Sequence, residues 1–364
     1  GEYKEYTAVR VHIEGMRPGC VNSLSFMIEN IEALNDYVSI VNNQSNYWMV
    51  RTMGGEYYHD FIDNEFIAIG YNEILLNTIR QLNEDNSIAR SQLREIVTSV
   101  YHDTIRPGQV VSQLLRFCRE IKIGDIIVVP NSNHEISICR VTGDVYEDVN
   151  AGRGGSNCIF MKRISIKILK QTRRFMLPPK AQLMFNSRHP ISDISHYAMY
   201  IDDSVCDFYN KNEETHLSLA INTENEVSAT VFYNIQKLFK ITGDFCLENG
   251  IEGTADDVVM KVQMESKGKL HFISSKKSYL ALLALGILFI NGGGLKINYN
   301  GFNLDLSTDG LFKKYDEYMD RKVDRELRMS IKNSLDSLDI KTPEDYTKAV
   351  IELYKTQNAN RNTY

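Results

Sequence analysis

The sequence predicts an α+β protein, built from a small, strongly bent sheet or barrel with covering helices, then a smaller α+β sandwich and C-terminal helices. Three observations predict this fold class. Short apolar strands with Gly-Asp turns recur between residues 123 and 169, as in a small barrel. Strand and helix patterns then follow the order β-α-β-β-α-β-β, and the last residues are charged and helical in spacing. We therefore divide the chain into a β-α lead-in (1–46), a barrel domain (47–209), an α+β domain (210–311) and C-terminal helices (312–364).

The individual elements follow from the spacing of apolar residues. In the lead-in, alternation predicts a strand, and apolar residues at helical spacing predict a helix after it. Two helices are expected in the barrel domain, separated by the Pro107-Gly108 break. The predicted strands of that domain are 47–53, 65–71, 126–129, 135–147 and 158–169.

The second domain has equally clear turn signals. A strand and an amphipathic helix come first, then a strand pair turned at Lys267-Gly268 and a leucine-rich helix. Asn300-Gly301 predicts a hairpin, because both residues tolerate the positive φ of a two-residue turn. A long charged helix follows Leu311, and Pro343 opens the last helix at its first turn.

Composition narrows the class of protein. With 43% hydrophobic and 24% charged residues the chain can bury a core, and its net charge of -6 argues against coating nucleic acid through bulk charge. The six cysteines lie far apart without metal-ligand spacing, which indicates reduced thiols and predicts no metal and no cofactor. The N-terminal residues lack the apolar centre of a signal peptide, so we expect a cytoplasmic protein.

The most unusual stretch runs from 47 to 72. It holds the only Trp of the chain (Trp48), Arg51, the pair Gly54 and Gly55, and several aromatic residues that include Tyr57. An aromatic plane, a planar cation and bare backbone amides together suit a flat heteroaromatic ring. The alternative is that Trp48 is an ordinary core residue, since large aromatic side chains dominate core burial.

Four motifs in this region occur in a recognisable order. They are W-x-V-R with G-G-E-Y and F-I-A-I-G-Y, then R-F-C-R-E-I-K-I-G-D-I-I-V-V-P, then I-C-R-V-T-G-D-V-Y, and finally M-K-R-I-S-I. Over residues 47–201 the chain thereby resembles the EVE-like (PUA-like) domain that precedes the nuclease of Mrr-type restriction endonucleases. The resemblance implies a half-open β-barrel whose aromatic-lined pocket accepts a base, typically a modified one, that is extruded from DNA.

The resemblance also implies a set of ligand-binding residues. Trp48, Arg51 and Gly55 match the W-x-V-R-x-x-x-G stretch, Tyr71 stands where the family usually has Trp, and Asp144 falls in a turn that is one residue longer here. Ordinary barrel-edge packing is the alternative for Tyr71, and a plain turn residue is the alternative for Asp144.

The most basic window of the chain follows the last barrel strand. It contains Lys167, Lys170, Arg173 and Arg174, which are either a solvated face or contacts to phosphates beside the pocket. With the resemblance, these features predict a non-catalytic nucleic-acid or nucleotide recognition protein of a bacterial restriction or anti-phage defence system. A homo-oligomer or a defence-system partner protein fits that setting, and a membrane contact does not.

Two alternative functions remain open. A diverged metal-dependent DNA endonuclease would use Asp257 with Glu265-Ser266-Lys267, but about 26 Å of extended strand separates the acids. A structural protein would use the apolar run 279–290, which is shorter than the roughly 20 residues of a membrane-spanning helix, to contact a partner or a membrane edge.

Overall fold

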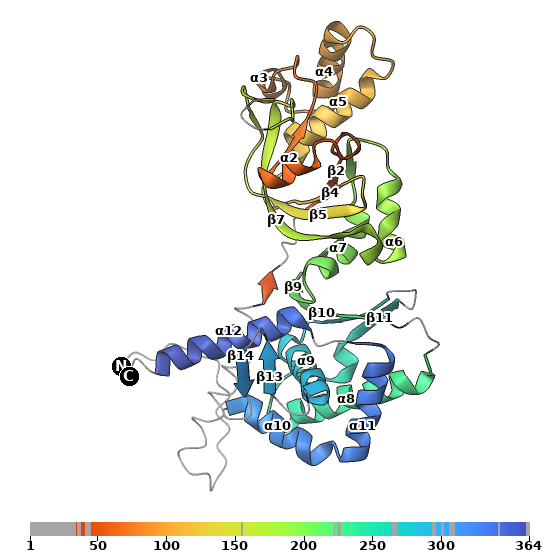
Figure 1. Cartoon of the computed structure of the whole chain (residues 1–364), viewed down its shortest axis with the longest axis vertical. Coiled ribbons are helices and arrows are strands. Elements are labelled where there is room, and N and C mark those ends of the chain that lie inside the picture. The colour runs from red at the N-terminus through yellow and green to blue at the C-terminus, as the bar shows by residue number, and fades with distance from the viewer. Residues whose placement is uncertain are drawn as a thin grey trace.

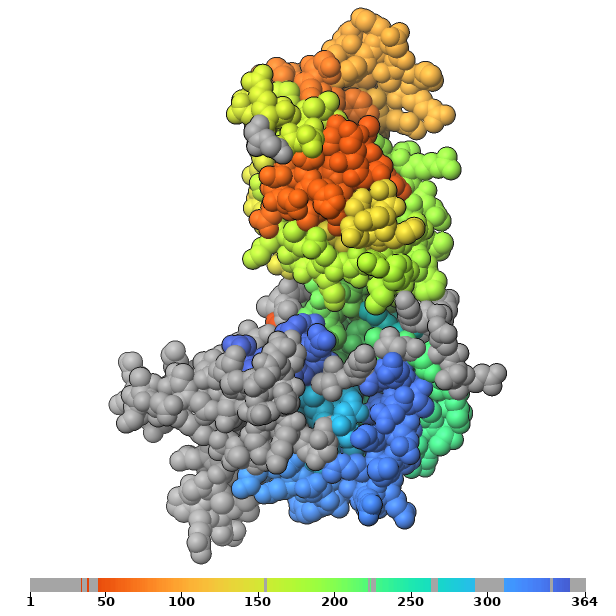
Figure 2. Space-filling model, viewed as in Figure 1, coloured from red at the N-terminus to blue at the C-terminus, as the bar shows by residue number. Residues whose placement is uncertain are grey.

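The computed structural model describes residues 34, 38–40, 45–153, 156–221, 223, 227–263, 268–292, 296–299, 302–305, 310–340 and 343–361. These residues form two bodies, which we call the barrel body and the second body (Figure 1). The molecule narrows where the two bodies meet (Figure 2). The strand and helix predicted for the lead-in lie outside the described residues, apart from positions 34, 38–40, 45 and 46.

The barrel body is built on one curled sheet of seven strands. Its order is β3-β7-β5-β4-β2-β8, with β6 paired to β7. Neighbouring strands are antiparallel except for β2 and β4, which are parallel. The strands are β2 (Tyr47–Val50), β3 (Phe66–Ile69), β4 (Ile126–Pro130), β5 (Glu135–Val141), β6 (Tyr146–Glu147), β7 (Lys162–Arg173) and β8 (Ile191–Asp193). A bent sheet of this kind confirms the predicted α+β class, and its identity as a PUA-like barrel stays a prediction.

Both faces of this sheet are covered. Because successive side chains of a strand point to opposite faces, Trp48 and Val50 join an inner core, whereas Tyr47 and Met49 join an outer core. The outer core is covered by α6 (Pro179–Gln182) and α7 (Ala198–Val205), which contribute Ala181 and Ile201 among other residues. All four residues of β2 are therefore buried.

A helical hairpin projects from the barrel at the end away from the second body (Figure 1). It consists of α4 (Asn86–Val100) and α5 (Pro107–Leu115), which share their own apolar core. Asp85 caps α4, because its carboxylate accepts the backbone N–H of Ser87 at 2.7 Å. Pro107 occupies the first turn of α5, where no N–H donor is needed. The short helices α2 (Tyr58–Asp63) and α3 (Leu76–Arg80) complete this body.

The second body contains a five-stranded sheet, the two-stranded sheet β13-β14 and the helices from α8 to α12. The strand order of the five-stranded sheet is β1-β9-β10-β12-β11, and β1 of the lead-in pairs with β9 in parallel. Beyond residue 212 the elements β10, α8, β11, β12, α9, β13 and β14 follow the predicted order. The elements are β1 (Ser39–Ile40), β9 (Phe208–Lys211), β10 (Glu214–Ala220), α8 (Ala229–Glu248), β11 (Val259–Gln263), β12 (Lys269–Ser274), α9 (Lys277–Gly292), β13 (Lys296–Tyr299), β14 (Phe302–Asp305), α10 (Gly310–Lys322), α11 (Arg325–Ser337) and α12 (Glu344–Arg361).

Helix α9 is the centre of the second core. Its apolar side chains from Tyr279 to Ile290 are buried, and none of them is more than 7% exposed. The alternative in which 279–290 contacts a partner or a membrane edge is therefore wrong, because α8, β10, β12 and α11 already cover this helix. Among the described residues, no helix combines the length and the apolar character needed to cross a bilayer.

Asp207 ties the start of α12 to the rest of the second body. Its carboxylate accepts the backbone N–H groups of Glu344 at 2.7 Å and Asp345 at 3.0 Å. Burial, and then the nearby Asp345 carboxylate, raise the pKa of Asp207 to about 6. A carboxyl group whose pKa is raised by folding favours the folded state most when the group is protonated. Its contribution to the free energy of unfolding is therefore largest at low pH, and it is lost as pH rises from the ordinary value of 3.8 through about 6.

We expect Asp207→Ala to lower the free energy of unfolding by about 0.5–2 kcal/mol through loss of the cap. The stability of the wild type relative to the variant should also fall as pH rises from about 4 to about 6, because only the wild type carries the Asp207 carboxyl group. Urea titrations across this range measure both effects. A variant that keeps the wild-type pH dependence would show that another group is responsible.

Candidate functional site

Trp48 does not face an open pocket. Its side chain lies in the inner core at 5% exposure, and its Nε1 donates to Asp125 Oδ2 at 2.9 Å. The same carboxylate accepts the backbone N–H groups of Asn46 and Lys122 at 2.8 and 3.0 Å. The prediction that the indole projects from the barrel wall into free space is therefore wrong. The reason is that β2 is an inner strand with both faces covered, so alternation does not bring either face to solvent.

One glycine of the pair, Gly55, serves an internal contact. Gly54 and Gly55 both have positive φ, at 70° and 104°, which L side chains rarely adopt. A Cβ at Gly55 would lie 2.7 Å from Ser132 Oγ and 2.8 Å from Asn131 Oδ1, so the close approach is made by the β4–β5 turn. Tyr57 is buried and packs edge-to-face on Phe160, with ring centroids 5.1 Å apart.

Two further predicted ligand residues, Tyr71 and Asp144, lie outside β2 and the loop that follows it. Tyr71 is half-buried with φ of 64°, and its ring packs edge-to-face on Tyr101. Its carbonyl accepts a hydrogen bond of 2.8 Å from Lys162, a fully buried amine whose pKa is lowered by burial. Asp144 is exposed in the turn between β5 and β6. The structure therefore does not gather the predicted residues into one aromatic pocket.

The four predicted phosphate contacts do not form one ridge. Lys167 lies opposite Arg140 and Lys170 lies opposite Ile138, an outer-core residue, so both lysines are on the outer face of β7. The pairing of β5 and β7 is irregular between Ile138 and Cys139, and Arg173 lies opposite Glu135. Because of this irregularity, the simple two-residue alternation of the sequence does not predict which cations share a face.

Arg51 lines a cavity of about 550 Å³ beside the start of β8. The other lining residues are Phe185 and Asn186, at the end of the 3-10 helix Leu183–Asn186, and Arg188, in the loop before β8. Arg51 directly follows β2, and its backbone N–H donates to Pro190 O at 2.8 Å. Its guanidinium donates from Nε and Nη2 to the carbonyl oxygen of Ser187, and from Nη2 to that of Phe185 at 2.8 Å. The cation is thus held in place by backbone carbonyls.

The cavity is strongly positive. The Arg174 guanidinium lies over the Phe185 ring, 5.0 Å from its centroid, and Arg188 is exposed at the cavity. Burial, and then the charge of Arg174, lower the pKa of Arg51. Within the part of the chain that the structure describes, no carboxylate forms an ion pair with Arg51, Arg174 or Arg188. The Nη1 group of Arg51 has no hydrogen bond to the described residues, so it can donate to a bound anion.

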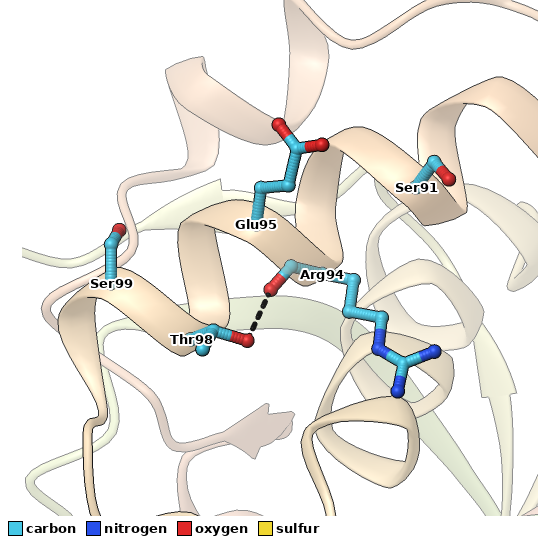
Figure 3. Close-up of a pocket in the computed structure, with 5 residues that line it drawn as sticks. All are labelled: Ser91, Arg94, Glu95, Thr98 and Ser99. Carbon is cyan, nitrogen blue, oxygen red and sulfur yellow. Dashed lines mark hydrogen bonds between the residues drawn. The ribbon is translucent and has the colours of Figure 1, made fainter.

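A second hollow lies along one helix. It is lined by Ser91, Arg94, Glu95, Thr98 and Ser99, which form a polar stripe on α4 (Figure 3). Thr98 Oγ1 donates to the Arg94 carbonyl of the same helix at 2.8 Å. Because these residues come from one helix and do not converge on a point, this stripe lacks the arrangement of a binding site.

The endonuclease alternative gains no support from the described residues. Asp257 accepts hydrogen bonds from the backbone and the hydroxyl of Thr254 in a helix cap. Residues 265–267 lie outside the described residues. Among the residues that are described, no three His, Cys, Asp or Glu side chains gather as a metal site would require.

Sequence reasoning found Arg51 and Arg174 but missed their neighbours. Phe185, Asn186 and Arg188 lie about 135 residues after Arg51 and carry no motif. The available signal was weak: a run of polar and cationic residues between a predicted helix and a strand. The pairing of β2 with β8 is what brings that run next to Arg51.

Comparison with known proteins finds one family model that matches part of the chain, and it supplies no activity. A family described as a domain of unknown function (DUF8426) matches residues 46–152, which is less than a third of the chain. The matched stretch contains β2 to β6 and the helical hairpin, but it ends before the loop that supplies Phe185 and Arg188. No curated protein matches the chain.

Proposed function

We propose that the cavity lined by Arg51, Phe185, Asn186 and Arg188, which we call the arginine cavity, binds the phosphate of a nucleic acid or nucleotide with Arg174 beside it. The observation that carries this proposal is that Arg51 and Arg188 line the cavity and Arg174 lies over its residue Phe185, all three without an acidic partner among the described residues. Arg51 is also fixed by backbone carbonyls. Guanidinium groups bind phosphate with two parallel hydrogen bonds, and a fixed group loses less side-chain entropy on binding.

Holding such cations together carries a cost that an anionic ligand would offset. The charge of Arg174 lowers the pKa of Arg51, which means that the two guanidinium groups repel each other. A phosphate between them would remove this repulsion. The protein as a whole has a net charge of -6, so binding would depend on this local group of cations rather than on bulk charge.

The cavity favours recognition of phosphate over recognition of a base. Phe185 is only 8% exposed, and Arg174 lies over its ring, so the ring offers little surface for stacking. The selectivity for modified bases and the role in restriction or anti-phage defence, which the family resemblance implies, stay predictions. The cavity supports only the part of that hypothesis that concerns the phosphate.

The test is fluorescence anisotropy with labelled oligonucleotides, single-stranded and duplex, at several salt concentrations. Arg188→Ala is the informative variant because Arg188 is exposed and makes no hydrogen bond that holds the fold within the described residues. Loss of a charge-assisted contact of about 1.5–3 kcal/mol predicts a Kd roughly 10-fold to 100-fold higher. The salt dependence should also fall, because fewer counterions are released.

Arg94→Ala is the matched control, since Arg94 is an exposed arginine on α4 of the same body. Its Kd should equal that of the wild type. If Arg188→Ala and Arg94→Ala weaken binding equally, the arginine cavity is not the binding site. If the wild type binds neither nucleic acids nor nucleotides at low salt, the proposed function is wrong.

A further inference from the structure

An exposed apolar surface lies beside the arginine cavity. It is formed by a 3-10 helix (Arg174–Met176), which directly follows β7, and by the region of α6, which this short helix contacts. Three large apolar side chains are exposed there: Phe175 at 46%, and Met176 and Leu183 at 55% each. Single exposed apolar residues are ordinary, whereas a group of them on one surface marks a binding site more often. We call these three residues the Phe175 surface.

Arg174 connects the Phe175 surface to the arginine cavity. Its guanidinium lies 5.0 Å from the centroid of the Phe185 ring, which lines the cavity. Its Nη2 donates at 3.4 Å to the carbonyl oxygen of Gln182, the residue directly before Leu183. Phe175 directly follows Arg174, so the Cα atoms of these two residues are about 3.8 Å apart. A flexible ligand a few nucleotides long can therefore contact the cavity and the Phe175 surface together.

Cationic side chains accompany the apolar ones. Arg173 and Lys180 are exposed, and Arg174 is partly exposed. Among the described residues none of these three cations forms an ion pair, although Glu135 lies opposite Arg173 on β5. The Arg173 guanidinium lies 5.8 Å from the centroid of the Phe175 ring. The surface thus suits a ligand that carries both flat apolar groups and negative charges.

A nucleic-acid strand has both kinds of group. Its bases stack on aromatic side chains, and its phosphates bind arginine. Phe175 is 46% exposed, whereas Phe185 of the cavity is 8% exposed, so Phe175 offers the stacking surface that the cavity lacks. In a duplex the faces of each base are covered by its neighbours in the stack, and only unstacked bases present a face to an aromatic side chain.

We propose that the arginine cavity takes single-stranded nucleic acid, with a phosphate bound in the cavity and a nearby base of the same strand stacked on Phe175. This inference rests on the proposed function, because it requires the cavity to bind phosphate. The stacking contact tolerates any sequence, since every base has a flat face. Phe175 should therefore contribute to the binding of a single strand and not to the binding of a duplex.

Fluorescence anisotropy with three labelled probes of equal length, at one salt concentration, tests this inference. The probes are a single strand, the duplex of the same sequence, and a strand of abasic sites, which keeps the phosphates but has no bases. The wild type should bind the single strand more tightly than the abasic strand by roughly 5-fold to 150-fold, the range for stacking of one base on an aromatic side chain.

The variants separate stacking from the phosphate contact. Phe175→Ala should raise the Kd for the single strand to that for the abasic strand, and it should leave the Kd for the abasic strand and for the duplex unchanged. Phe175→Trp should keep the preference for the single strand, because an indole also stacks on bases. Arg188→Ala should weaken binding of the single strand and of the abasic strand by the same factor.

Tyr233→Ala is the matched control. Tyr233 is an aromatic residue of α8 in the second body, is 60% exposed, and has Lys237 Nζ 4.6 Å from the centroid of its ring. It thus combines an exposed ring with a cation, as Phe175 does, but it does not line the arginine cavity. The Kd of this variant for each probe should equal that of the wild type.

The outcomes distinguish this inference from the proposed function. If the wild type binds the single strand and the abasic strand equally well, stacking is absent and the inference is overturned, while phosphate binding stands. The inference is also overturned if Phe175→Ala keeps the preference for the single strand, or if Tyr233→Ala reduces that preference as much as Phe175→Ala. If the wild type binds none of the three probes, the proposed function fails and the inference fails with it.

Discussion

Replacement of Trp48 by alanine is expected to lower the free energy of unfolding by about 3–5 kcal/mol, the range for loss of a buried Trp side chain. Two effects add. The inner core loses a large ring that is 5% exposed, and Asp125 loses the indole N–H that its buried carboxylate accepts at 2.9 Å. The second effect matters because Asp125 is 2% exposed and water cannot easily replace the lost donor.

Urea denaturation of the wild type, Trp48→Ala and Trp48→Phe measures this cost. Phenylalanine keeps most of the ring, so Trp48→Phe should be clearly more stable than Trp48→Ala. At low temperature, where the alanine variant is still folded, its Kd for oligonucleotides should be that of the wild type. If Trp48 instead stacked on a base, truncation would weaken binding by about 1–3 kcal/mol and leave stability nearly unchanged. That result would contradict the buried position of the indole.

The indole of Trp48 was predicted to face a pocket, and it is buried in the inner core. This difference shows which properties local sequence patterns can predict. The order of strands and helices depends on spacing and turn residues, and the order predicted from β10 to β14 is the one observed. The single long helix predicted after Leu311 is instead two helices, α10 and α11. The exposure of a strand residue depends instead on what covers each face. β2 pairs with β4 and with β8, which lie far away along the chain, and helices close in sequence to β8 cover its outer face. No pattern within 47–72 contains that information.

The cations predicted as phosphate contacts were hard to place for a related reason. Lys167, Lys170, Arg173 and Arg174 form one basic run in the sequence, but the irregular pairing of β5 with β7 assigns them to different surroundings. Only Arg174 lies over Phe185, a residue of the arginine cavity. At Gly55, too, the sequence predicted a close approach but not the group that makes it. A glycine is required there because Ser132 of the same chain, rather than a ligand, comes close to it.

The substitution with the largest expected effect lies in α9. Leu283 is 0% exposed at the centre of the second core, and Leu283→Asp would bury a carboxylate without a partner, at a cost well above the roughly 4–5 kcal/mol that is already exceptional for one substitution. Because no hydrophobic cluster of the described residues crosses the junction between the two bodies, we expect the second body to unfold while the barrel body keeps its own thermal transition. Limited proteolysis should then leave a protected fragment that contains the barrel body.

The control for this substitution is Leu247→Asp, because Leu247 lies on α8 of the same body and is 81% exposed. Its effect should stay within about 0.5 kcal/mol, as for other surface changes. If Leu283→Asp folds as well as the control, α9 is not the core of the second body, and its apolar residues would again be available for a partner. If both bodies unfold together, the stability of the barrel body depends on the second body. The polar contacts that Asp202 and Asp203 of α7 make with β9 and β12 would then not be the only coupling, and the two bodies would form one cooperative unit.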